Sequence, residues 1–184
     1  MRANVHDTQA NPKALSHVDL LVDVQCADGA TLPASCDLAA VAGRAFEIIQ
    51  RDGYASEFLT HTGVANAGEH RETELCVRLV DAAEGQALNT QWRGKDAPTN
   101  VLSFTSDIIA GDCVPLGDLV LCAPVIENEA LEQDKALGDH YSHLLVHGVL
   151  HLLGYDHLVE TEAEAMERIE VAVLGELGID NPYE

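Results

Sequence analysis

The chain is poor in basic residues and has no long apolar stretch. Its 184 residues hold 10 Lys and Arg against 31 Asp and Glu, which gives a formal net charge of −21. Because general nucleic-acid binding is driven largely by cationic side chains that meet phosphates, this balance excludes a protein that coats nucleic acid, and no DNA partner is expected. No run of 18 or more apolar residues occurs, so no membrane-spanning helix is expected either.

A disulfide framework and a signal peptide are also missing. The five cysteines are odd in number, scattered and without a CxxC pair, which is typical of reduced thiols in the cytoplasm rather than of a disulfide-bonded secreted chain. The first residues contain no apolar stretch of signal-peptide length. We therefore expect a cytoplasmic protein without a membrane partner, and a flexible N-terminal extension over residues 1–16.

The remaining residues, 17–184, predict a single domain of the α+β class. Apolar residues make up 47% of the chain, which is enough for a buried core at this length. Strands are expected at 18–25, 74–80, 101–104 and 116–122. Helices are expected from Asp37 to Arg51, Asp81 to Gln91, Pro124 to Leu137, Asp139 to the histidines described below, and over 160–177, with one short helical piece in the loop 52–72. Their irregular alternation favours a small mixed β-sheet flanked by helices.

Three histidines near the C-terminal end carry the clearest functional signal. They are His147, His151 and His157 in the run HGVLHLLGYDH. A spacing of four places the first two on one face of a helix, and Gly154 suits the helix end, where the chain can turn back with the third imidazole. Three imidazoles with an open fourth position are typical of a catalytic zinc site. We expect one Zn²⁺ per chain, held by a helix of the C-terminal half and the loop after it.

Two alternative interpretations of this run stay open. The histidines could be incidental to a core helix, although desolvated imidazoles without partners cost free energy. The spacing also matches the HExxHxxGxxH pattern of a metalloprotease class, but Gly148 stands where those enzymes carry the general-base Glu. The metal ligands of such a protease are present and its proton acceptor is missing.

A second stretch, NTQWRGKDAPTNVLSF at 89–104, places cationic side chains in a loop between a helix and a strand. Arg93 could hold a phosphate there with two hydrogen bonds. On spacing alone, an ordinary charged surface loop is the simpler interpretation. Residues 44–95 are nearly balanced in charge, whereas residues 96–184 hold 18 acidic and 2 basic residues, so a polyanion must approach through the middle of the chain.

Together the two stretches resemble the YbeY family of bacterial rRNA maturation factors, which are single-strand-specific metallo-endoribonucleases. The resemblance is carried by NxxxRxKDxPTNVLSF at 89–104, Gly117-Asp118 before a strand, HGxLHLLGYDH at 147–157 and the tail from Glu162 to Met166. It covers residues 73–184 well and 16–52 weakly. Trp92 departs from the Tyr that is more frequent in the family; it could stack on a base or pack underneath the loop.

The resemblance implies a zinc-dependent endoribonuclease that acts on single-stranded rRNA precursors at the 3′ end of the 16S rRNA, and in ribosome quality control. It implies metal ligands at His147, His151 and His157 and a functional arginine at Arg93. It also implies the family's small mixed sheet flanked by helices, with the metal at one end of a cleft. The expected partners are RNA and ribosomal proteins or the small ribosomal subunit.

Other residues of the two stretches are candidates for weaker roles. Lys95 and Asn100 are candidate phosphate contacts, and His143, four residues before His147, is a candidate substrate contact or a structural histidine. Asp96 and Asp156 are candidate bases. The residues leave open whether an activated water attacks the phosphorus or instead removes the proton of the neighbouring 2′-hydroxyl group.

Two rival functions stay open as well. One is a non-enzymatic ribosome-assembly factor with a structural metal, whose acidity would suit a basic ribosomal protein. A structural site with an open position would be unusual, however. The other is a metalloprotease, against which the missing Glu at position 148 counts.

Overall fold

A four-stranded mixed sheet forms the frame of the structure. The computed structural model describes residues 17–184 apart from 31, 34–35, 64–70, 107–112 and 158, so the expected flexible extension, 1–16, lies outside the described residues. The strands are ordered β1-β2-β4-β3, with β1, β2 and β4 parallel and β3 antiparallel to β4. Their bounds are Val18–Cys26 (β1), Arg71–Val80 (β2), Val101–Thr105 (β3) and Cys113–Cys122 (β4).

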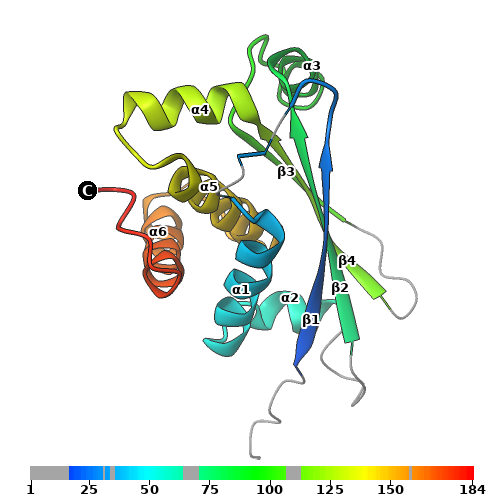
Figure 1. Ribbon diagram of the computed structural model, residues 1–184. Coiled ribbons are helices and arrows are strands. Elements are labelled where there is room, and N and C mark those ends of the chain that lie inside the picture. Colours follow the sequence, from blue (N-terminus) through cyan, green and yellow to red (C-terminus); the bar gives the residue numbers. More distant parts are fainter. Residues whose placement is uncertain (1–16, 31, 34–35, 64–70, 107–112, 158) are drawn as a thin grey trace, which may run out of the picture.

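The described part of the chain holds six helices, and most of them gather on one side of this sheet (Figure 1). Their bounds are Leu38–Arg51 (α1), Ser56–His61 (α2), Ala82–Arg93 (α3), Ala123–Glu132 (α4), Leu137–Leu152 (α5) and Glu160–Glu176 (α6). Helices α1 and α5 pack on one face of the sheet and α6 packs on these two helices, while Leu88 of α3 packs on a small cluster on the other face. The predicted α+β domain with a small mixed sheet is confirmed. No helix in the described part of the chain could span a membrane.

Two predicted helix starts are confirmed by their caps. The Asp37 carboxylate accepts a hydrogen bond from the backbone N–H of Ala40 at 3.0 Å, and the Asp81 carboxylate accepts one from Glu84 at 2.8 Å. Each aspartate satisfies a backbone donor that the first turn of a helix leaves free. These local bonds fix where α1 and α3 begin.

The boundary between α4 and α5 was predicted wrongly. Helix α4 ends at Glu132 rather than at Leu137, and Leu137 instead begins α5, so Asp139 lies inside the first turn and does not cap it. The reason is Asp134, whose φ of +53° is left-handed; Asp tolerates this conformation better than most residues. Inside the first turn, Asp139 still carries a negative charge favoured near a helix N-terminus.

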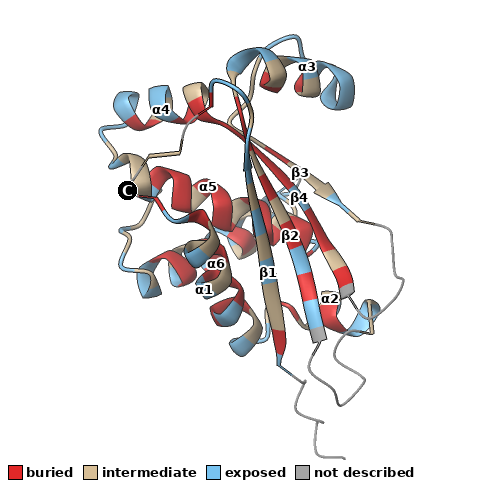
Figure 2. Ribbon diagram, turned by 45° about the vertical axis from the view of Figure 1, so that its right-hand side comes forward, coloured by how far each residue is buried: buried red, intermediate tan, exposed pale blue. Residues whose placement is uncertain are grey.

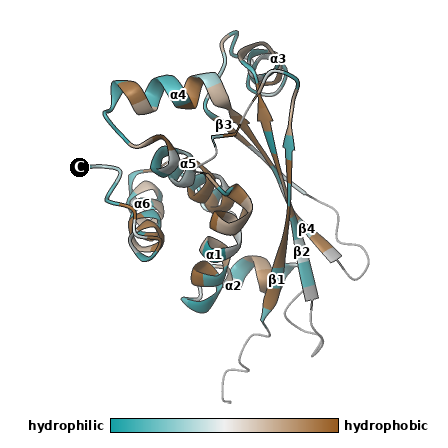
Figure 3. Ribbon diagram, in the orientation of Figure 1, coloured by the Kyte–Doolittle hydropathy of each residue, from teal (hydrophilic) through white to brown (hydrophobic). Residues whose placement is uncertain are grey.

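Helix α5 is the central helix of the domain, and most of its residues are buried (Figure 2). Figure 3 shows that the strands it faces are largely hydrophobic in their middle sections. Gly148 lets the helix approach β4 closely: a Cβ added there would lie 2.7 Å from Cδ2 of Leu119, which is fully buried. The side of α5 that carries Gly148 is therefore committed to the core, and His147 and His151 lie on the neighbouring side.

We expect Gly148→Ala to destabilise the fold by about 1–3 kcal/mol, because the added methyl group overpacks the contact between α5 and β4. Urea unfolding followed by circular dichroism measures the effect. The matched control is Gly43→Ala in α1, where a Cβ would meet nothing within 4 Å; there we expect no loss and a gain of up to about 1 kcal/mol. Equal changes in the two variants would contradict the packing argument.

Candidate metal centre

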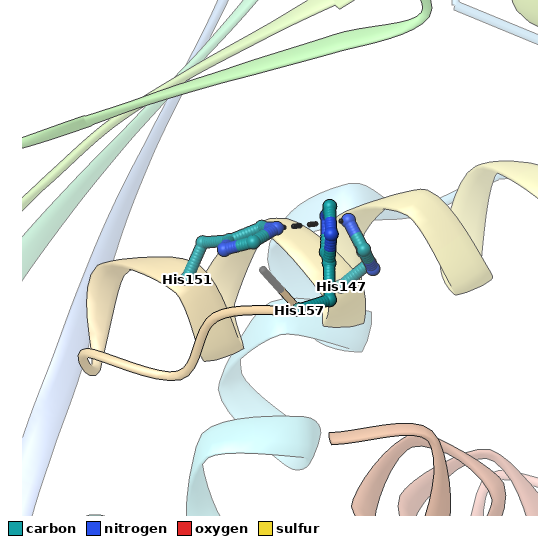
Figure 4. Close-up of side chains that lie close together, drawn as sticks. All are labelled: His147, His151 and His157. Atoms are coloured by element: carbon teal, nitrogen blue, oxygen red, sulfur yellow. Dashed lines mark hydrogen bonds between the residues drawn. The ribbon is translucent and has the colours of Figure 1, made fainter. Parts of the chain in front are cut away.

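Helix α5 and the loop after it bring the three predicted histidines together. One ring nitrogen from each of His147, His151 and His157 lies within 4.8 Å of the other two. The ring centroids are 4.6, 5.6 and 5.0 Å apart. Figure 4 shows the first two rings on α5 and the third on the following loop, all directed to one region. His147 and His151 are partly buried and His157 is exposed, so a cation held here would be reachable from solvent.

A left-handed glycine and hydrogen bonds made by the loop turn the chain back toward the helix. Gly154 has φ +97°, a conformation that residues with a side chain rarely adopt, so its predicted place at the helix end is confirmed. The Tyr155 hydroxyl donates to the backbone O of Tyr54 at 2.9 Å. The Asp156 carboxylate accepts from the backbone N–H of His157 at 2.7 Å, so it shapes the loop; a role for Asp156 as a base stays a prediction.

Hydrogen bonds at Nδ1 determine where two of the imidazoles carry their protons. Nδ1 of His147 lies 2.8 Å from Oε1 of Glu170, and Nδ1 of His151 lies 2.9 Å from the backbone O of Tyr155. A carboxylate and a carbonyl only accept, so each Nδ1 carries a hydrogen and donates it. In a neutral ring, Nε2 then holds a lone pair.

The two Nε2 atoms of His147 and His151 face each other at 3.0 Å. Two lone pairs at this distance repel unless a proton or a metal ion lies between them. Burial lowers the pKa of His151, and the neighbouring His147 lowers it further, which disfavours the protonated ring. The donor set therefore fits a metal ion that binds neutral imidazoles.

Glu170 of α6 supports this site and was missed by the sequence analysis. Its side chain is fully buried and accepts hydrogen bonds from Nδ1 of His147, from Nε2 of His143 at 3.1 Å, and from the hydroxyl of Tyr183. Burial alone raises the pKa of Glu170, but these three bonds outweigh burial and hold its pKa at about 2. The ionised carboxylate thereby orients His147, as acidic partners of metal-binding histidines commonly do.

A sequence signal for Glu170 did exist. The residue lies on the buried side of α6, in line with Met166, Ile169 and Val173, and is the charged member of that apolar stripe. A charge buried in such a stripe needs a partner. His143 supplies one of its three hydrogen bonds, so His143 has a structural partner, and substrate binding by His143 stays a prediction.

The cationic loop was predicted correctly as exposed. Helix α3 ends at Arg93, and Gly94 at φ +68° closes it. The side chains of Arg93 and Lys95 are exposed, and among the described residues neither makes a hydrogen bond or an ion pair. Each of the other basic side chains that the structure describes has such a partner: Arg44, Arg51, Arg78, Lys135 and Arg168.

Asn100, the third candidate in this region, is held within the fold. Its Nδ2 lies 3.1 Å from both carboxylate oxygens of Glu129, and its Oδ1 accepts from the backbone N–H of Val101 at 2.7 Å. Within the described residues, no hydrogen bond joins Asn100, Arg93 or Lys95 to the three histidines. Strand β3, which follows the loop, does pack against α5, so a role for these residues in substrate binding stays a prediction.

Comparisons with known proteins agree on one family. A family model described as Endoribonuclease YbeY matches residues 48–178. The Endoribonuclease YbeY of Stenotrophomonas maltophilia (strain K279a) is 54% identical over 136 residues, which cover 70% of this chain and 83% of the relative. That of Alteromonas mediterranea is 55% identical over 114 residues, or 61% of this chain and 72% of the relative.

Among solved structures, a Thermotoga maritima protein determined in solution aligns over 86% of this chain and 92% of its own, with 22% identity and a TM-score of 0.44. The family model spans well over half of the residues, including the cationic loop and all three histidines. The chain belongs to the YbeY family.

Proposed function

We propose that this chain is a metal-dependent endoribonuclease that cuts single-stranded RNA during rRNA maturation, at the 3′ end of the 16S rRNA. Membership of the YbeY family and the name Endoribonuclease carried by its relatives support the reaction type. The observation that carries the proposal is the convergence of three imidazoles, two of which have Nδ1 committed to an acceptor and Nε2 directed to a common point. The site of action is the cytoplasm, where rRNA precursors and the small ribosomal subunit are found.

In this proposal His147, His151 and His157 hold the metal ion. Zinc is the expected ion, because three imidazoles with an open position are typical of catalytic zinc. When bound at such a site, zinc supplies Lewis acidity and activates water near neutral pH. Imidazole also suits nickel, copper and iron, so elemental analysis of protein purified without added metal identifies the ion.

The protein's own side chains prepare the site and neutralise charge. Glu170 keeps the ring of His147 in one tautomer and one orientation. Arg93 and Lys95 offset the negative charge that grows on the phosphoryl oxygens. Since neither cation is paired with a carboxylate in the described structure, no intramolecular ion pair has to break before a phosphate binds.

The rival functions are less well supported. Gly148 packs against Leu119 of β4, so a general-base Glu at this position of a protease would have to displace the core. The net charge of −21 suits contact with a basic ribosomal protein. Such a partner would deliver the RNA to the metal centre. The acidity of the chain therefore favours a ribosomal partner in addition to catalysis, not a ribosomal partner without catalysis.

We expect His147→Ala and His151→Ala to lose both bound metal and cleavage of single-stranded RNA. Arg93→Ala keeps its metal but loses about 10²–10³ in kcat, as removal of one charge-stabilising donor does. Elemental analysis and a gel assay on single-stranded RNA, duplex RNA and casein measure these effects. Arg44→Ala and His61→Ala are the controls, because both side chains are exposed and, among the described residues, neither is hydrogen-bonded to the histidine triad.

Histidine variants that lack metal and still cut RNA as fast as the parent would refute the proposal, since the activity would then belong to a contaminant. Full activity of Arg93→Ala would remove its role at the phosphate. Cleavage of casein that a chelator abolishes would favour the protease instead.

We expect Glu170→Gln to weaken metal binding by about 10- to 100-fold, the usual cost of losing the acidic partner of a metal-binding histidine. The amide has nearly the same size, so the loss reflects the charge and the changed hydrogen bonding at His147. Competition with a chromogenic chelator measures the affinity, and thermal unfolding confirms that the variant is folded. Glu176→Gln on the same helix, where Glu176 pairs with Arg51 on the surface, keeps the parental metal affinity. A folded Glu170→Gln variant with parental affinity would contradict the orienting role.

A further inference from the structure

Trp92, the single tryptophan of the chain, lies on the surface beside the two unpaired cations. Its side chain is 60% exposed although it is large and apolar, so the alternative in which it packs underneath the loop does not hold. Arg93 follows Trp92 directly, and Lys95 lies three residues after Trp92. Surfaces that bind single-stranded nucleic acid combine these features: aromatic rings on which bases stack and cations that follow the backbone.

The indole is held in place from one side. Its ring centroid lies 5.6 Å from that of Phe104 in β3, in an edge-on arrangement with an interplanar angle of 69°. Phe104 itself packs on the apolar cluster of Leu102 and Val120. Such an edge-on contact leaves most of the indole uncovered, since Trp92 is 60% exposed. A ring fixed in this way loses little conformational entropy when a planar ligand stacks on it.

The charges around the indole favour an anionic ligand. Asp96, the acid nearest in sequence, accepts a hydrogen bond from Nε2 of Gln86 at 2.8 Å. The Lys95 backbone O accepts one from the hydroxyl of Thr90 at 3.2 Å, so the segment that carries both cations is tied to α3. In a chain of net charge −21, this is the described surface where a phosphate backbone meets free positive charge.

Strand β3 separates this surface from the metal centre and also connects the two. Its end, Thr105, pairs with Gly117 of β4, and a Cβ added at Gly117 would lie 2.8 Å from Cδ2 of Leu152. Leu152 follows His151 on α5. Phe104, which contacts the indole, belongs to the small apolar cluster on the face of the sheet away from α5, so a base stacked on Trp92 is a neighbour of the nucleotide at the bond that is cut and not that nucleotide itself.

We propose that Trp92 stacks on an unpaired base of the RNA that neighbours the cut bond, so that Arg93 and Lys95 meet the phosphates between this base and the metal centre. This inference rests on the proposed endoribonuclease function and gives a physical reason for its single-strand preference. In a duplex both faces of each internal base are covered by its neighbours, so no face is available to the indole. Because every base has a π-face, the contact selects unpaired RNA without selecting a sequence.

The sole tryptophan makes a direct measurement possible. Metal-loaded protein is titrated with a 2′-O-methyl single-stranded oligonucleotide, checked on a gel to be intact, and with the same sequence annealed into a duplex. We expect saturable quenching of the tryptophan fluorescence by the single strand and little change with the duplex. If anisotropy of a labelled oligonucleotide shows that the single strand binds, and the tryptophan fluorescence does not change, the proposal is overturned.

Variants test the same contact through kinetics. Trp92→Ala raises KM for single-stranded RNA by about 5- to 150-fold, the affinity equivalent of one base stacked on an aromatic ring, and leaves kcat and bound metal unchanged because the ring does not touch the reacting phosphate. Trp92→Tyr, which keeps an aromatic face, restores most of the affinity. Leu131→Ala is the control, since Leu131 is also an exposed apolar side chain, at 81%, but lies on α4.

The outcomes distinguish a failure of the stacking contact from a failure of the endoribonuclease function. Parental KM in a folded Trp92→Ala variant overturns the stacking contact and leaves the endoribonuclease function standing. A metal-loaded parent that cuts neither free RNA nor ribosomal precursors refutes the function itself. If Trp92→Ala does not fold, Trp92→Tyr and the fluorescence titration of the parent decide.

Discussion

The buried hydrogen bond between His147 and Glu170 is the interaction on which the candidate metal centre depends. A carboxylate without exposed surface is costly to keep ionised, and here three donors from α5 and the C-terminal segment meet it. In return it fixes the hydrogen of His147 on Nδ1 and leaves Nε2 free for a cation. The spacing of His147 and His151 alone places two rings on one helix face. Which ring nitrogen of His147 stays free is determined by Glu170 of α6, which Tyr183 also contacts.

Helix α5 combines two requirements on adjacent sides. Gly148 commits one side to close contact with Leu119 of β4, and this contact sets the distance between the helix and the sheet. The neighbouring side carries the histidines toward solvent. Because packed cores deform little, the contact between α5 and β4 also fixes the positions of His147 and His151. These two rings are therefore as rigid as the core beneath them, which suits side chains that hold a cation at fixed distances, while His157 reaches them from the exposed loop.

Features governed by local chemistry could be predicted from the sequence, and features governed by distant packing could not. The caps at Asp37 and Asp81, the turn at Gly154 and the approach of His151 to His147 all involve residues within about one or two helical turns of each other, where helix geometry alone gives the answer. Glu170 lies 23 residues from His147, so its role needed the packing of α6 on α5. The end of α4 was missed for another reason: Asp134 takes a left-handed conformation that its residue type permits but does not require.

The acidity of the chain bears on how it would select its substrate. Most of its described basic side chains are engaged within the fold, so the protein as a whole repels a polyanion, over a range that salt limits to about 8 Å in physiological conditions. Repulsion grows with the charge density of the ligand, and a duplex carries more phosphates per length than a single strand. Stacking on an indole is uncharged and open to unpaired bases alone. In the proposed function, the net charge disfavours the duplex, and the surface of Trp92, Arg93 and Lys95 attracts the single strand. The preference for single strands then follows from the difference between this repulsion and this attraction. It requires no hydrogen bonds to base edges.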